Sequence, residues 1–297
     1  MTISNSVLHS ATQPTPAQSG PAYAGAARPA GPRICMLPGL LVSPAWLAEH
    51  LDAVDLRLVD MRSADEYAES HLPNAVHLDM NALAQEEAGV PGMLIGPAAY
   101  AAIMGQLGID DGAAVILYDS NWGMAAARAL WTLHRYGHTN IAVLDGGWDR
   151  WQEEERPASS TPHVPQTTTF VARPDETRLA TLAWVQAHLD DPGVVLVDTR
   201  TPGEYAQGHL PGAINWDWMN GVPVGSWNTL RPPAELYGDL TAHGITPDKE
   251  IVTYCRSGAR AAHTYLLLRH LGYPRVRNYD GSWLEWSARV LGIDAHG

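Results

Sequence analysis

Residues 251–271 read IVTYCRSGARAAHTYLLLRHL: a short apolar run, Ile251 to Tyr254, then a cysteine-containing turn, then a helix-like stretch, Ala261 to Leu271. A cysteine on a glycine-containing turn between a strand and a helix directs its sulfur at backbone N–H groups, and the helix N-terminus adds partial positive charge. Both effects favour the thiolate, which is the reacting form of cysteine. Because Arg256 and Arg260 add further positive charge, the segment predicts an enzyme site that holds an anion beside a nucleophilic sulfur.

The composition narrows the class of protein. The chain has 297 residues, of which 45% are hydrophobic and 17% charged, as expected for a globular protein with two domains. Its formal net charge of -13 argues against nucleic acid or an anionic membrane as a partner, and no apolar run is long enough to span a bilayer. The two cysteines, Cys35 and Cys255, are too few for a thiolate metal cage. They indicate one working thiol in a reducing, cytoplasmic compartment.

Most of the chain repeats itself, and the matching segments lie at an offset of 138 residues (198 − 60) that falls to 135 (280 − 145) near the ends. They are VDMR at 59–62 with VDTR at 197–200, HLP at 71–73 with HLP at 209–211, and DGGW at 145–148 with DGSW at 280–283. An almost constant offset over this span predicts two homologous domains. We place them at residues 38–155 and 179–294.

Two segments lie outside the repeats. The first 35 residues are rich in Ala, Pro, Ser, Gly and Thr and contain no Asp or Glu, so we expect a disordered leader over residues 1–37. A targeting role for the leader and an alternative start at Met36 both stay open. Residues 156–178 are rich in proline, which predicts an extended linker that wraps over both domains.

Short apolar runs alternate with helix-like stretches within each repeat. Helices are predicted at Met124–Tyr136 and Ala259–Leu271, and strands buried on both faces are predicted at Leu56–Val59, Val115–Tyr118, Ala142–Leu144, Val194–Val197 and Ile251–Tyr254. This alternation predicts an α/β fold in which each domain is a mostly parallel sheet with helices on both faces. Ligands of such sheets bind beyond the carboxyl ends of the strands, where the Cys255 turn lies.

Taken together, these features resemble the rhodanese family of sulfurtransferases in its tandem two-domain form. The resemblance covers nearly all of residues 38–294 and is carried by DTR at 198–200, EY at 204–205, GHLPGA at 208–213, the Cys255 turn, and NYDGSW at 278–283. It implies catalysis by the C-terminal domain alone. The counterpart turn of the first repeat has Asp119 in place of Cys255, and a carboxylate cannot carry a sulfane sulfur. We therefore expect the first domain to be catalytically silent.

The chemistry expected of such a site is a two-step sulfur transfer through a Cys255 persulfide, without a metal or an organic cofactor. The donor is a small anion such as thiosulfate, and the acceptor is cyanide or a thiol, including a thioredoxin-like protein. We expect the persulfide to be held by N–H groups of the residues after the cysteine, namely Arg256, Ser257, Gly258, Ala259 and Arg260.

Three arginines are candidate donor-binding residues. Guanidinium groups suit oxyanions because they offer a planar fork of donors, which favours Arg256 and Arg260. The alternatives are a solvated side chain for Arg256 and an ion pair at the helix start for Arg260. Arg200 is a weaker candidate, because its twin Arg62 in the first repeat favours a structural ion pair, for which we expect Glu204 as the partner.

Several other residues with chemical potential have structural interpretations. Asp198 is expected to cap loop N–H groups, and Asp280 and Trp283 to maintain the fold, because each has a twin in the first repeat. His263 lies about two helical turns after Cys255 and is expected at the surface or in the core. Trp122 is expected to be a core or surface aromatic, with a place in the cleft between the domains as the alternative.

Within the family that the chain resembles, loops of the mercaptopyruvate type lack both arginines. The two arginines therefore favour thiosulfate as donor, and 3-mercaptopyruvate is the alternative. Cysteine phosphatases and arsenate reductases are a further alternative, but they place arginine six residues after the cysteine, whereas here the spacing is five (260 − 255). A non-enzymatic persulfide carrier is the remaining alternative function. Since the duplication already supplies a domain pair, we expect a monomer.

Overall fold

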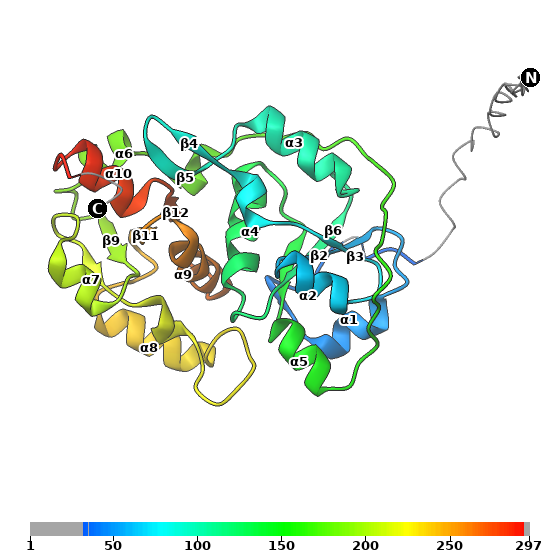
Figure 1. Cartoon of the computed structure of the whole chain (residues 1–297). Coiled ribbons are helices and arrows are strands. Elements are labelled where there is room, and N and C mark those ends of the chain that lie inside the picture. Colours follow the sequence, from blue (N-terminus) through cyan, green and yellow to red (C-terminus); the bar gives the residue numbers. More distant parts are fainter. Residues whose placement is uncertain (1–31, 35, 294–297) are drawn as a thin grey trace, which may run out of the picture. The chain divides into compact units, whose positions relative to one another are not determined.

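The computed structural model describes residues 32–34 and 36–293. The expected disordered leader, residues 1–37, therefore lies almost entirely outside the described residues. The described residues contain two five-stranded sheets, each with helices around it (Figure 1). No helix within the described ranges combines the length and the apolar character needed to cross a bilayer.

The first sheet has the order β1-β7-β6-β2-β3, and all its neighbouring strands are parallel. Its strands are β1 (Leu41–Val42), β2 (Leu56–Asp60), β3 (Ala75–His77), β6 (Ala114–Tyr118) and β7 (Ile141–Leu144). The helices of this first domain are α1 (Pro44–His50), α2 (Ala64–Glu69), α3 (Pro97–Gln106), α4 (Met124–Arg135) and α5 (Gly147–Glu153). A short helix η1 (Met80–Leu83) leads into an antiparallel hairpin of β4 (Ala84–Glu87) and β5 (Val90–Leu94).

The second sheet has the order β10-β9-β11-β12-β8 and is also parallel throughout. Its strands are β8 (Leu179–Ala180), β9 (Val194–Asp198), β10 (Ile214–Asn215), β11 (Glu250–Tyr254) and β12 (Val276–Tyr279). The helices of this second domain are α6 (Leu182–Ala187), α7 (Pro202–Gln207), α8 (Pro233–Ala242), α9 (Ala259–His270) and α10 (Ser282–Arg289), with short helices η2 (Glu176–Arg178) before it and η3 (Trp218–Gly221) within it.

The predicted α/β class with mostly parallel sheets is confirmed. Each predicted strand is present and one residue longer than expected, and both predicted helices are one residue shorter, which is within the usual uncertainty of element ends. The repeat extends to the helix caps: Ser63 and Thr201 each accept the N–H of a glutamate three residues later, and that glutamate bonds back. These capping boxes start α2 and α7 at equivalent places. The β4–β5 hairpin was not predicted.

The two domains share one hydrophobic core. Helices α4 and α9 pack against each other and lie between the two sheets (Figure 1). A single cluster of buried side chains includes Leu130 and Trp131 of α4 together with Tyr265 and Leu266 of α9. Burial of this apolar surface at the contact favours a fixed domain pair over two independently moving domains.

Each domain also contacts a loop of the other domain. These loops follow β7 in the first domain and β12 in the second. The amide N–H of Leu94, at the end of β5, donates to the Asp280 carboxylate at 2.7 Å. The N–H of Thr229 in the second domain donates to the Asp145 carboxylate of the first at 2.8 Å. Because Asp145 and Asp280 are twins in the repeat, the two hydrogen bonds are pseudo-symmetric.

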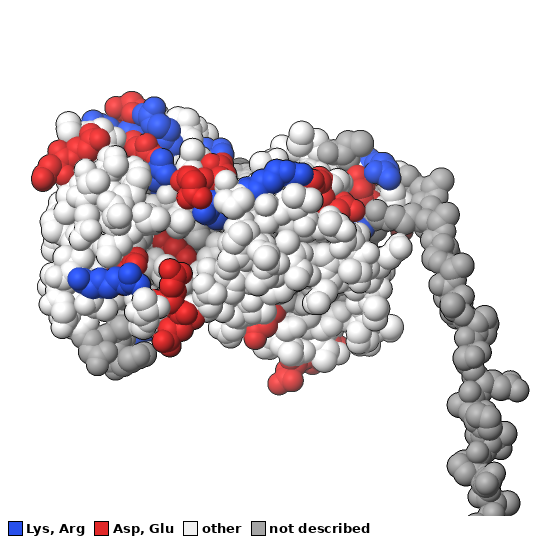
Figure 2. All heavy atoms as spheres, turned by 90° about the horizontal axis from the view of Figure 1, so that it is seen from above, with Lys and Arg blue, Asp and Glu red and all other residues white. Residues whose placement is uncertain are grey.

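Residues 156–178 run mainly along the first domain. Ser159 exchanges two backbone hydrogen bonds of 2.8 Å with His71, and Thr168 N–H donates to the Gly105 carbonyl at 2.9 Å. Contact with the second domain comes at the end of the segment, where the Arg277 guanidinium donates to the Glu176 carbonyl at 2.6 Å. On the face seen in Figure 2, the basic side chains of the described residues lie next to acidic ones rather than in a continuous basic patch.

Candidate active site

Cys255 follows the last residue of β11 and begins a tight loop, residues 255–258, that we call the cysteine loop. Gly258 ends the loop with φ +84°, a left-handed conformation that glycine adopts without steric penalty, and α9 begins at Ala259. The Gly258 N–H donates to the Cys255 Sγ at 3.1 Å, and Cys255 is only 1% exposed. The sulfur therefore lies at the N-terminus of a 12-residue helix, where partial positive charge favours an anion.

Further hydrogen bonds from β12 and α10 hold the backbone of the cysteine loop. The N–H of Cys255 donates to the Ser282 hydroxyl at 3.2 Å, and the N–H of Trp283 donates to the Cys255 carbonyl at 3.0 Å. The Asn278 side-chain amide donates to the Gly258 carbonyl at 3.1 Å. The sequence motif at residues 278–283 did not predict that Ser282 and Asn278 hold the loop. The sequence signal for this role was their place in a motif at the carboxyl end of β12, the strand next to β11.

Arg260, one of the two favoured donor-binding residues, forms a bidentate ion pair with Glu204 of α7. Its Nη1 and Nη2 atoms each lie 2.8 Å from a Glu204 carboxylate oxygen. The hydrogen bonds to Glu204 raise the pKa of Arg260, and so, to a smaller extent, does the nearby Cys255. The same hydrogen bonds from Arg260 lower the pKa of Glu204 to about 2. The ion pair that was the alternative expectation for Arg260 is therefore present at the start of α9.

Arg200 pairs with Asp198, so the expected Glu204 partner is wrong. Its Nη2 lies 2.6 Å from the Asp198 carboxylate and also donates to the Gly208 carbonyl at 2.7 Å. The guanidinium is buried and stacks on the Trp283 ring at 4.7 Å. Asp198 is close enough because it lies two residues away at the end of β9, whereas Glu204 is engaged by Arg260.

The first domain repeats this buried pair with Arg62 and Asp60, whose nearest atoms are also 2.6 Å apart. As expected, Asp198 also caps a loop N–H, that of Arg200, at 3.0 Å. The repetition of the pair in both domains indicates that it maintains the fold on which each loop is built.

Arg256 and Ser257 form the outer part of the cysteine loop. Arg256 is exposed, and it has no ion pair or side-chain hydrogen bond within the part of the chain that the structure describes. Its guanidinium is therefore available to an anion from solvent. Ser257 is half-buried beside Gly92 of the β4–β5 hairpin: a Cβ added to Gly92 would lie 3.5 Å from the Ser257 Cβ. The first domain thus borders the cysteine loop.

The equivalent loop of the first domain, residues 119–123, contains its own anion, and we call it the aspartate loop. The Asp119 Oδ1 accepts the N–H groups of Asn121 and Gly123 at 2.8 Å, and Oδ2 accepts the N–H of Ala126 at 3.0 Å. Gly123 is the left-handed cap of α4 and the twin of Gly258. The carboxylate therefore occupies the place that Sγ has in the second domain. Burial raises the pKa of Asp119, against the effect of these hydrogen bonds.

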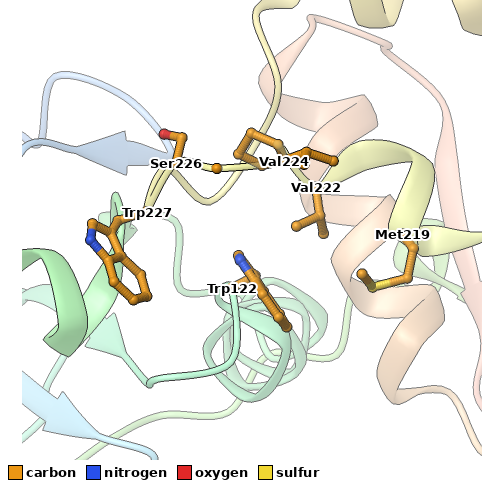
Figure 3. Close-up of a pocket in the computed structure, with 8 residues that line it drawn as sticks. Trp122, Met219, Val222, Val224, Ser226 and Trp227 are labelled. Atoms are coloured by element: carbon orange, nitrogen blue, oxygen red, sulfur yellow. The ribbon is translucent and has the colours of Figure 1, made fainter.

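A separate cavity of about 520 Å³ lies beside the aspartate loop. Its lining contains none of the cysteine-loop residues and consists of Trp122, Met219, Val222, Pro223, Val224, Gly225, Ser226 and Trp227. Figure 3 shows the side chains of Trp122, Trp227, Val222 and Met219 around this space. Trp122 is 39% exposed and lines this cavity together with residues of the second domain. It therefore lies between the domains, which was the alternative expectation for this side chain.

His263 lies in the core, which was one of its two expected positions. It is fully buried, and its Nε2 lies 3.1 Å from the Trp122 carbonyl of the first domain. Burial lowers the pKa of His263 to about 4, so the ring is neutral at physiological pH. A buried neutral ring hydrogen-bonded to a backbone carbonyl supports the domain contact rather than proton transfer at Cys255.

The fold and the cysteine loop define a tandem α/β protein with one thiol-bearing loop, and comparison with known proteins gives the family. The model of the rhodanese-like domain matches residues 43–154 and 181–289. The chain therefore belongs to the rhodanese family, with two such domains. Curated sulfurtransferases that are 32–36% identical to it give its enzyme class, sulfurtransferase.

The similar proteins include sulfurtransferases that are named for two different donors and a sulfur carrier protein. The thiosulfate sulfurtransferase of Pseudomonas aeruginosa is 36% identical over 260 residues, covering 83% of this chain and 93% of the relative. The sulfur carrier protein TtuD of Thermus thermophilus is 34% identical over 281 residues, covering 85% and 95%. The crystal structure of the 3-mercaptopyruvate sulfurtransferase SseA from Escherichia coli matches with a TM-score of 0.76 and 29% identity, covering 82% of this chain and 99% of that one.

Proposed function

We propose that the chain transfers a sulfane sulfur from thiosulfate to a thiophilic acceptor through a persulfide on Cys255, and that the second domain alone carries the reaction. The observation that carries the proposal is the geometry of the cysteine loop. Its sulfur lies at the N-terminus of α9 and accepts the Gly258 N–H at 3.1 Å. The equivalent loop of the first domain is filled by the Asp119 carboxylate and offers no thiol.

In the first half-reaction, the Cys255 thiolate forms a bond to the outer sulfur of thiosulfate. The sulfur–sulfur bond of the donor breaks, and sulfite leaves with the bonding electron pair. Cys255 then carries an anionic persulfide, for which the N–H groups of residues 256–260 are the expected donors. The same amides and the helix N-terminus stabilise the charge before and after transfer.

In the second half-reaction, cyanide or a thiolate attacks the outer sulfur of the persulfide. The new bond gives thiocyanate or a new persulfide on the acceptor, and the electron pair of the broken bond returns to Cys255 as thiolate. The scheme consumes one donor and one acceptor per cycle. A thiol of a thioredoxin-like protein fits the acceptor role equally well, because the chemistry requires only a thiophilic nucleophile.

Two arginines support an anionic donor, in different ways. Arg256 is exposed and has no ion pair among the described residues, so we assign to it the direct contact with the donor and with the departing sulfite. Arg260 is already paired with Glu204, so its part is to keep positive charge near the sulfur and to fix the start of α9. The free guanidinium of Arg256 favours a compact dianion such as thiosulfate.

The alternative donor is 3-mercaptopyruvate, and the likeness to SseA supports it. The Cys255 thiolate would attack the sulfur of this donor, the carbon–sulfur bond would break, and its electron pair would leave on the enolate of pyruvate, which takes up the thiol proton. A carrier role without steady-state turnover is the second alternative, since one relative is named a sulfur carrier protein.

Thiocyanate formation from cyanide, with thiosulfate and 3-mercaptopyruvate compared in parallel, tests the proposal. We expect thiosulfate to be preferred, Cys255→Ser to abolish turnover, and Cys35→Ser, the matched control at the other cysteine, to leave it intact. Thiosulfate without acceptor should add the mass of one sulfur atom to the wild type but not to Cys255→Ser. A preference for mercaptopyruvate would overturn the donor assignment, and sulfur loading without turnover would favour the carrier.

A further inference from the structure

Ser282 has an unfavourable backbone conformation at the start of α10. Its φ is +52°, in the left-handed region that side-chain-bearing residues avoid. The twin position in the first domain is Gly147, whose φ is +55°. The fold therefore requires a left-handed residue at this position in both domains. Glycine meets that requirement without steric penalty, whereas serine is strained there.

The Ser282 side chain connects the ends of two neighbouring strands. Its hydroxyl donates to the Tyr279 carbonyl, at the end of β12, at 2.7 Å. It accepts the N–H of Cys255, which follows β11, at 3.2 Å. Because the single hydroxyl proton is used on Tyr279, a lone pair of the oxygen is left for the Cys255 N–H. Ser282 is fully buried, so water does not compete for this hydrogen bond.

The first domain excludes such a side chain. A Cβ on Gly147 would lie 2.1 Å from the Asp119 carbonyl oxygen, which is far inside van der Waals contact. The aspartate loop is instead held by its own carboxylate. A strained serine with a hydroxyl on the loop backbone is thus a feature of the thiol-bearing domain, where the loop lacks an internal carboxylate.

We propose that Ser282 is a positioning residue for Cys255. Its hydroxyl fixes the peptide plane between Tyr254 and Cys255, so that Sγ stays in line with the Gly258 N–H and the axis of α9. The strain at Ser282 is tolerated because this hydrogen bond holds the reacting residue in place. The inference rests on Cys255 as the nucleophile of the proposed function, but it is independent of the sulfur donor.

Alkylation of Cys255 by iodoacetamide, followed by mass analysis of the peptide that contains it, tests the inference without any sulfur donor. We compare the wild type with Ser282→Ala, which keeps the strain but loses the hydroxyl, and with Ser282→Gly, which loses both. Both variants should react about threefold to tenfold more slowly than the wild type, the range for one lost hydrogen bond. Relief of the strain should raise the melting temperature of Ser282→Gly above that of Ser282→Ala by roughly 2–4 °C.

The two variants separate positioning from stability. Equal slowing of alkylation in both, despite different melting temperatures, supports the inference. Wild-type reactivity in Ser282→Gly, or reactivity that follows the melting temperature, overturns it. The control is Asn74→Gly, a left-handed residue of the first domain with φ +64°, whose twin Gly212 has φ +72°. It should alkylate at the wild-type rate, and slowing as large as that of Ser282→Gly would also overturn the inference.

Turnover with thiosulfate in the same variants separates this inference from the proposed function. If the wild type alkylates at Cys255 but does not turn over thiosulfate, the donor assignment fails, and the alkylation series still decides the role of Ser282. If the wild type turns over and Ser282→Gly both alkylates and turns over normally, the proposed function stands and the positioning role fails.

Discussion

The first residue of each loop decides what the loop can do: it is Asp119 in the first domain and Cys255 in the second. Both loops follow a buried strand, end in a left-handed glycine, and begin a helix of 12 residues. In one loop the Gly258 N–H donates to a sulfur, and in the other the Gly123 N–H donates to a carboxylate. The shared architecture is therefore an anion-binding loop, and the side chain of its first residue decides whether the anion is built in or can react.

The built-in carboxylate should stabilise the first domain. Asp119→Ala leaves three backbone N–H groups, two of them on buried residues, without their acceptor, and we expect it to lower the free energy of unfolding by about 2–4 kcal/mol. Asp119→Asn keeps one oxygen acceptor and should lose less. Urea unfolding of both variants measures the difference. Wild-type stability in both variants would show that the hydrogen bonds from the loop amides to Asp119 contribute little.

Arg256 should act on charged reagents more than on neutral ones. Removal of its exposed guanidinium in Arg256→Gln should lower kcat/KM for thiosulfate roughly tenfold, the effect of one charge-assisted hydrogen bond. Alkylation by uncharged iodoacetamide should change much less, and Arg256→Lys should restore part of the thiosulfate rate. A parallel loss with both reagents would instead assign Arg256 to the shape of the loop.

At the scale of elements, the side chain of Glu204 in α7 links this helix to α9. Glu204 completes the capping box of α7 with Thr201 and also receives both Nη atoms of Arg260 from the first turn of α9. The twin Glu66 caps α2 in the same way, but the residue equivalent to Arg260 is Ala125. The capping box is therefore common to both domains, whereas the link to the helix after the loop belongs to the second.

This link predicts a pH dependence of stability. The Glu204 pKa is lowered from 4.5 to about 2 in the folded state, first by the hydrogen bonds from Arg260. Its contribution is thus fully present above about pH 4.5 and is lost as the pH falls toward 2. The stability difference between wild type and Glu204→Gln, from urea unfolding, should be constant from pH 8 to pH 6 and shrink below about pH 4.5. A difference that stays constant down to pH 3.5 would contradict this pairing.

The strands, the helices and the cysteine loop are predictable from the sequence because they depend on local signals: apolar runs, glycine positions and the repeat. The sequence did not predict the correct partner of Arg200, since Asp198 and Glu204 are both within reach in sequence and only the fold decides between them. It also did not predict the hydroxyl of Ser282 on the Cys255 N–H. That contact depends on the register of β12 beside β11, which is a tertiary property.

At the scale of the whole described chain, the first domain is part of the setting of the cysteine loop. Arg128 of α4 lies with its Nη2 2.6 Å from the Asp280 carboxylate, and both side chains are nearly buried. A Cβ added to Gly258 would lie 2.8 Å from the Arg128 Nη1. Asp280 in turn accepts the N–H of Leu94 from the β4–β5 hairpin. The expectation that Asp280 maintains the fold therefore extends to the contact between the domains.

The twin of Asp280 provides a matched comparison for the role of this contact. Asp145 makes the pseudo-symmetric bond to Thr229, but its ion pair with Arg150 is partly exposed, with 28% and 21% side-chain exposure for Arg150 and Asp145. Arg128→Met leaves Asp280 buried and unpaired, which should cost about 3–5 kcal/mol of stability. Asp145→Asn removes a more exposed pair and should cost about 1 kcal/mol or less.

The two variants should also differ in reactivity. In Arg128→Met the Gly258 backbone loses the guanidinium packed against it, so we expect slower Cys255 alkylation and slower turnover at temperatures where the chain is still folded. Asp145→Asn disturbs the equivalent contact at the aspartate loop and should leave both rates unchanged. If the two variants lowered the rates equally, the contact would act through general stability, whereas selective loss in Arg128→Met would show that the first domain supports the reacting loop directly.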